Sequence, residues 1–198
     1  MPSVPPGRDF WLYGLGAGGH DYGDSVGHPS TLAAVTINTL NEAWVREVRR
    51  KQTGDTNWIE QQRRELSQKY RISLSRWGFD PMQREAARLS GADVIISGQR
   101  RLRVGMIEAR MGDPPKLFFD MSGPGVAAAY EQGIRIHWRK VMRPGQGEVF
   151  EYARIDDDDF ASIENAIQVI DSKPPAPPRR ATVRLPQWRP GVGAWRSV

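Results

Sequence analysis

The sequence predicts an α+β fold in which N-terminal helices pack on a small, mostly antiparallel sheet. Strand patterning is dense only in the stretch 91–155, helical spacing precedes it from Ser30, and both chain ends are rich in glycine or proline. These observations divide the chain into a glycine-rich arm over 1–30, a single α+β domain over 31–172 and a basic, proline-rich arm over 173–198.

Composition bounds the class of protein. The 198 residues are 39% hydrophobic, which is enough for one globular domain with a buried core. The net charge of +5 is uneven, because the C-terminal arm carries six basic side chains and no acid. Cysteine is absent, which excludes disulfides, cysteine-ligated zinc and cysteine nucleophiles. No secretory signal or membrane-length apolar run is visible, so we expect a soluble protein in the cytoplasm or within a particle.

The N-terminal arm contains a glycine motif. Gly14-Leu-Gly-Ala-Gly-Gly19 matches the dinucleotide-binding pattern G-x-G-x-x-G letter for letter. That function needs a helix to start at the third glycine, whereas the residues from His20 to Pro29 do not start a helix. We interpret the motif as part of an extended arm that docks on a surface through its aromatic residues.

Polar side chains gather in the same arm. His20, Asp21, Asp24 and His28 are of the types that bind zinc or iron. Their spacing matches no metal signature, and a flexible glycine-rich loop pre-organises ligands poorly. A metal site at His20, Asp24 and His28 is thus an alternative to an ordinary polar loop, which we favour.

Three helices are predicted before the strands. The first begins after Pro29, the second is capped by Asp55 or Thr56, and the third begins at Asp80-Pro81 and ends at Leu89. The apolar positions of the first two recur at helical spacing: Leu32, Val35, Leu40, Trp44 and Val48, then Ile59, Leu66, Tyr70, Leu74 and Trp77.

The strand-rich stretch begins with a meander of three strands, predicted over 93–97, 102–110 and 116–120. A short helix over 126–132 follows. The stretch ends in a hairpin that pairs 134–141 with 148–155 across a Pro-Gly-containing turn.

Four consecutive acids, Asp156–Asp159, come next. They precede the apolar positions of a last helix, which are Phe160, Ile163, Ile167 and Ile170. Acids at the positive end of a helix are electrostatically favourable. A calcium loop would need ligands at alternating positions and a central glycine, so we interpret the run as a helix start.

The C-terminal arm combines stiffness, charge and aromatic rings. Its prolines enforce an extended spacer. Arginine interleaved with tryptophan is typical of a segment that lies on nucleic acid or in a groove of a partner protein. A merely solubilising tail is the alternative, but exposed indoles do not favour solubility. We predict binding through Arg179, Arg180, Arg184, Trp188, Arg189, Trp195 and Arg196.

One constellation is compatible with catalysis. On the predicted strand 102–110, Glu108 and Arg110 share a face, and Asp93 begins the strand before it. This arrangement resembles the core of PD-(D/E)xK nucleases over roughly residues 80–141. The resemblance implies that Asp93 and Glu108 hold a divalent metal such as Mg²⁺, with Arg110 in place of the family's lysine. A structural ion pair between Glu108 and a neighbouring arginine is the alternative.

These observations lead to two hypotheses. The first is a non-enzymatic structural or assembly subunit without a cofactor, held to other subunits, or to nucleic acid, by its two arms. Virions and ribonucleoprotein or organellar complexes are the settings where such subunits are common. The second is a metal-dependent nuclease or toxin domain that uses Asp93 and Glu108. From the sequence we favour the assembly subunit.

Overall fold

A computed structural model describes residues 15–23, 27–79, 94–95, 100–145, 147–152 and 157–172. The strands are β1 (Ala17–Asp21), β2 (Ser30–Ile37), β3 (Ala43–Lys51), β4 (Trp77–Phe79), β5 (Val94–Ile95), β6 (Leu117–Phe119), β7 (Trp138–Arg143) and β8 (Gly147–Tyr152). The helices are α1 (Thr56–Tyr70), α3 (Arg100–Met111), α4 (Val126–Tyr130) and α5 (Asp158–Ser172), with a 3₁₀ turn at Leu74–Arg76 and a π-helical turn at Glu131–His137.

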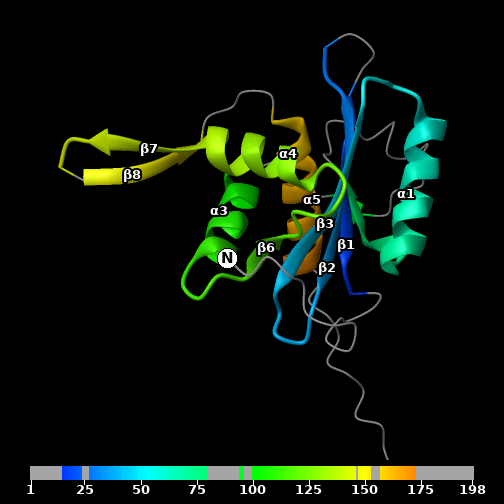
Figure 1. The fold of residues 1–198 in the computed structure, drawn as a ribbon, viewed down its shortest axis with the longest axis horizontal. Helices are drawn as coiled ribbons and strands as arrows, with labels where there is room; N and C mark the ends of the chain where they lie inside the picture. Colours follow the sequence, from blue (N-terminus) through cyan, green and yellow to red (C-terminus); the bar gives the residue numbers. More distant parts are fainter. Residues whose placement is uncertain are drawn as a thin grey trace, which may run out of the picture.

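A mixed sheet with the strand order β5-β4-β1-β2-β3-β6 forms the centre of the fold. The strands β1, β2 and β3 make an antiparallel meander, while β4 runs parallel to β1, β5 to β4, and β6 to β3. Figure 1 shows α1 on one face of this sheet and α3, α4 and α5 on the other. The hairpin β7-β8 forms a separate two-stranded sheet that extends away from this body.

Each face of the sheet has its own apolar core. Under α1 the buried residues are Tyr22, Leu32, Ala34, Ile59, Leu66, Ile72, Trp77 and Phe79. On the other face, β1, β2 and β3 pack against α5, whose residues from Asp158 to Ile170 are all buried. Because both faces are covered, β2 lacks the polar alternation of a half-exposed strand.

Glycines of β1 allow close packing on both faces of the sheet. A Cβ added at Gly19 would lie 1.8 Å from the carbonyl oxygen of Ser162 in α5, and one at Gly18 would lie 2.2 Å from the Trp77 ring in the cluster under α1. Only glycine fits where the α5 backbone comes this close to β1. The glycine motif of the sequence therefore lies partly in an inner strand of the sheet, so at least Ala17–Asp21 belong to the domain rather than to an arm.

The first predicted helix is wrong, because β2 and β3 occupy its residues. They are joined by a turn in which the Asn38 side chain accepts hydrogen bonds from the backbone amides of Leu40 and Glu42. The uninterrupted burial of Thr31–Val35 removes the period of two that identifies a strand. Apolar residues at intervals of three to five then imitate helical spacing.

The predicted strand 102–110 is also wrong, since these residues form α3. Its buried positions Arg103, Ile107 and Arg110 recur at intervals of four and three. Two of them are arginines, which are buried by ion pairs with Glu164 and Asp171 of α5. A hydrophobicity pattern cannot register a helix face that is partly basic.

The α+β class itself is confirmed, but the sheet is mixed rather than mostly antiparallel. The second predicted helix is α1, with Asp55 as its N-cap. It ends at Tyr70 because Arg71 adopts the left-handed conformation, so Leu74 and Trp77 belong to the following turn and to β4. The predicted helix over 126–132, the hairpin and the last helix correspond to α4, β7-β8 and α5.

Parts of the sequence prediction lie outside the described residues. They are the third predicted helix and the basic C-terminal arm. Of the predicted strand 93–97, the described residues form β5. In the part of the chain that the structure describes, no helix is long and apolar enough to cross a membrane.

Candidate functional site

A row of polar residues crosses the sheet at one end of α5. Asp21 of β1 pairs with Thr31 of β2, and Thr31 pairs with Arg50 of β3. Paired residues of neighbouring strands share a face, and Thr31 shares its face with Ala33 in the core beneath α5. The Thr31 hydroxyl donates a hydrogen bond of 2.7 Å to the backbone carbonyl of Asp158. The row therefore lies at the first turn of α5.

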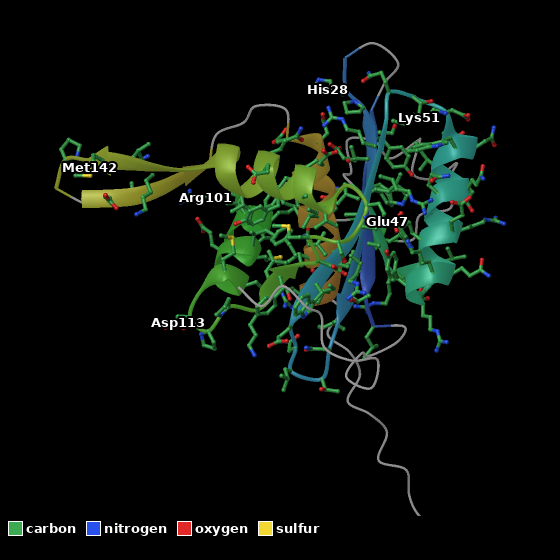
Figure 2. The ribbon with its side chains drawn as sticks, viewed as in Figure 1. His28, Glu47, Lys51, Arg101, Asp113 and Met142 are labelled. Carbon is green, nitrogen blue, oxygen red and sulfur yellow. The ribbon has the colours of Figure 1, made fainter. Side chains whose placement is uncertain are left out.

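Asp158 is the first residue of α5, and its carboxylate contacts a histidine from a distant segment. Oδ1 of Asp158 lies 3.3 Å from Nδ1 of His28, in the connection between β1 and β2. The Asp158 side chain is nearly buried, whereas that of His28 is 76% exposed. Figure 2 shows His28 and Lys51 at the same end of the sheet. This end thus carries an accessible imidazole beside a carboxylate.

Asp159 lies deeper and pairs with Arg50. Nη1 of Arg50 is 3.2 Å from Oδ2 of Asp159 and 3.4 Å from Oε1 of Gln132. The other carboxylate oxygen of Asp159 is buried, and no described residue forms a hydrogen bond with it. Burial raises the pKa of the Asp159 carboxyl above its ordinary value; Arg50 opposes this rise, and the charge of Asp158 adds to it.

The predicted metal set of His20, Asp24 and His28 is not brought together. His20 lies on the α1 face, stacked on Tyr22 and edge-on to Trp77, with 1% of its surface exposed. His28 lies on the surface beside Asp158, and Asp24 is outside the described residues. Among the residues that the structure describes, no three side chains of His, Asp or Glu are grouped closely enough to hold a metal by themselves.

The structure does not contain the strand on which the PD-(D/E)xK resemblance placed Glu108 and Arg110. Glu108 is exposed on α3, and Arg110 on the same helix donates hydrogen bonds to Asp171 and to the backbone carbonyl of Asn41. Asp93 lies outside the described residues. Arg110 therefore forms a structural ion pair with Asp171, whereas the alternative considered from the sequence was an ion pair between Glu108 and an arginine. The predicted binding residues of the C-terminal arm, Arg179, Arg180, Arg184, Trp188, Arg189, Trp195 and Arg196, also lie outside the described residues.

Sequence reasoning missed the juxtaposition of Asp21 and Asp158. In the sequence Asp21 resembles any of several polar residues of a loop, and Asp158 is part of a predicted helix start. The second interpretation is correct, since α5 begins at Asp158. One sequence signal could have identified the site. A glycine-rich strand ends in an acid, and a helix much later in the chain begins with acids.

Comparison with known proteins identifies the fold. No protein-family model and no curated protein matches the sequence. Among solved structures, the large terminase nuclease from thermophilic phage G20c is 14% identical, with a TM-score of 0.54 over 84% of this chain and 90% of that one. The g2p (large terminase) nuclease domain of bacteriophage SPP1 with bound Mn is 11% identical, with a TM-score of 0.54 over 76% and 83%. The fold is that of large-terminase nuclease domains.

A longer protein contains the same terminase-nuclease fold. This large terminase, from another thermophilic bacteriophage, is 10% identical with a TM-score of 0.55, and the match covers 84% of this chain but 41% of that protein. These matches contradict the expectation of a non-enzymatic structural or assembly subunit, because two of the structures that share the fold are nucleases. The nuclease alternative agrees better with the fold, although Glu108 and Arg110 were sought on a strand that is in fact α3.

Proposed function

We propose that this chain is a metal-dependent nuclease in which Asp21 and Asp158 are the catalytic carboxylates. One observation carries the proposal: two acids far apart in the sequence lie at the same end and on the same face of the sheet, linked through Thr31. Terminase nucleases share this fold, and the SPP1 domain contains bound Mn. The substrate would be the phosphodiester backbone of a nucleic acid.

The donor set at this end fits a small divalent cation. Mg²⁺ and Mn²⁺ favour carboxylate oxygens, and Mg²⁺ sites commonly use one or two carboxylates together with water and substrate phosphate. Asp21 and Asp158 would supply the carboxylates. A bound cation would stabilise charge on the phosphate and make a coordinated water a better nucleophile.

The surrounding residues would keep these carboxylates in place. Thr31 holds the backbone of Asp158 through its hydroxyl, and His28 contacts the Asp158 carboxylate from the solvent side. The amino end of α5 adds a positive field that favours an approaching phosphate. Each contribution comes from a different element, so the site depends on the intact sheet and helix.

Cleavage assays with matched variants test the proposal. Purified full-length protein is incubated with plasmid DNA, or with RNA, in Mg²⁺, Mn²⁺ or EDTA. We expect cleavage that EDTA abolishes, and we expect Asp21→Asn and Asp158→Asn each to lose more than about a hundredfold, since even outer partners of metal ligands are worth ten- to a hundredfold. Glu108→Gln, at an exposed position on α3, is the control and keeps wild-type activity.

Two results would overturn the proposal. One is the absence of metal-dependent cleavage by the folded wild type on both nucleic acids. The other is full activity of both aspartate variants, which would move the carboxylates to other residues.

A further inference from the structure

The ion pair between Arg50 and Asp159 joins β3 to the first turn of α5. Arg50 follows Arg49, whose side chain points to the opposite face and contacts Glu47 and Glu65. The Asp159 side chain is 6% exposed, and Arg50 is its ion-pair partner. The pair thus reaches from the solvent edge of the sheet into the packed interface with α5.

Two neighbouring strands hold two successive residues of that turn. Thr31 of β2 binds the carbonyl of Asp158, and Arg50 of β3 binds the carboxylate of Asp159. Thr31 and Arg50 are paired with each other in the sheet. Because one contact holds the backbone carbonyl of Asp158 and the other holds the side chain of the next residue, together they restrict movement of the turn relative to the sheet.

We propose that Arg50 is a positioning residue, which acts through Asp159 to hold the first turn of α5 and thereby the direction of the Asp158 carboxylate. The inference rests on the proposed function, in which Asp158 is a catalytic carboxylate. Arg50 itself needs no contact with the reacting atoms for this role.

Because Asp159 is buried, loss of its ion pair with Arg50 should displace the first turn of α5. One of the Asp159 carboxylate oxygens has no hydrogen-bond partner among the described residues, and Arg50 is the cation that pairs with the other oxygen there. Removing the arginine alone leaves a buried carboxylate uncompensated, and the turn must move to bring it toward water. Removing both charges leaves no such group, so the double variant is less disturbed than the single one.

If Arg50 bound the substrate directly, its replacement would change a different kinetic constant. Its side chain is 40% exposed, so it could instead bind a phosphate of the substrate. Loss of a phosphate contact would raise KM, and neutralising Asp159 would not restore it. Loss of positioning would lower kcat with little change in KM, and neutralising Asp159 would restore most of it.

The experiment is a double-mutant cycle of Arg50→Gln, Asp159→Asn and the combination, assayed with Mn²⁺ and an oligonucleotide duplex. We expect Arg50→Gln to lower kcat at least about tenfold with KM unchanged within about twofold. The double variant should recover most of the lost kcat. Arg49→Gln, the adjacent arginine on the opposite face, is the matched control and keeps the wild-type kcat.

Hydrogen exchange in residues 157–165 provides a readout that does not need activity. Arg50→Gln should speed exchange there by at least about threefold, and the double variant should restore it. If the wild type cleaves nothing, the proposed function fails while this measurement still decides the role of Arg50. A double variant no better than Arg50→Gln in exchange, or in kcat where the wild type cleaves, would overturn the inference.

Discussion

Gly19 of β1 faces the carbonyl oxygen of Ser162 in α5, so closely that a Cβ at position 19 would stand 1.8 Å from that oxygen. The Asn165 side chain on the next turn donates a hydrogen bond to the carbonyl of His20. Backbone and side chain together thus seat α5 directly on an inner strand. The acids at the start of α5 owe their place to this contact, because a helix held further from the sheet would carry Asp158 away from Asp21.

Gly19→Ala should therefore destabilise the protein strongly. The added methyl collides with backbone, which cannot rotate away as a side chain can, so the cost should reach about 3 kcal/mol or more. Denaturant unfolding followed by circular dichroism measures it. Gly105→Ala on α3 is the matched control, since a Cβ there meets no atom of the described residues within 4 Å, and it should be neutral or stabilising by up to about 1 kcal/mol. Equal stability of the two variants would contradict the close contact.

The buried imidazole of His20 should make folding stability fall in mild acid. Burial, and to a lesser extent the charge of Arg63, lowers the pKa of His20 from 6.5 to about 3. The folded state thus keeps the ring neutral while the unfolded chain takes up a proton below pH 6.5. The contribution of this group is fully present above pH 6.5 and is lost progressively as the pH falls toward 3.

Replacement of this ring tests that pH dependence. His20→Phe keeps an aromatic ring between Tyr22 and Trp77 and removes the titrating group. The free energy of unfolding, measured from pH 7.5 to pH 4, should decline less steeply in the variant than in the wild type. Parallel curves for the two proteins would show that other groups cause the acid sensitivity.

The C-terminal arm stays a prediction from sequence, and its charge makes the predicted binding testable on a nucleic acid. Replacing Arg179, Arg180, Arg184 and Arg189 with serine should weaken binding and lower the slope of log affinity against log salt by up to about 3 to 4, since each phosphate contact releases about one counterion. Fluorescence anisotropy on a labelled duplex from 50 to about 300 mM salt measures that slope. Arg64→Ser on α1, which removes one exposed charge, is the control. An unchanged slope in the fourfold variant would mean that the arm does not contact phosphate.

Local signals in the sequence predict those elements whose cause is local. Asp55 caps α1 through its own side chain, and α5 begins within its run of acids. The elements β2 and α3 were mispredicted because the residues that stabilise them lie elsewhere in the chain. Burial of both faces of β2 needs α1 and α5, and the buried arginines of α3 need Glu164 and Asp171.

Local signals alone could not predict the candidate site, for the same reason. Nothing near Asp21 in the sequence indicates that its pairing with Thr31 will place it at the same end of the sheet as Asp158. The strand register and the contact with α5 that determine this are both long-range. The resemblance that led to Glu108 suggested a nuclease, but it assumed a strand where the structure has α3. A mixed sheet places its functional residues by topology, and that information is distributed over the whole domain.

The burial of α5 along its length sets the order in which this domain can mature during synthesis. The strand β1 is among the first described elements to leave the ribosome, and its partner helix is the last. Until residues up to Ile170 have emerged, this face of the meander lacks the cover of α5, and apolar side chains of β1 and β2 that pack on α5 stay open to solvent. Contacts of such long sequence separation form late and slowly. A nascent chain of this protein should therefore stay a client of chaperones until α5 docks, and only then would Asp21 and Asp158 lie at the same end of the sheet.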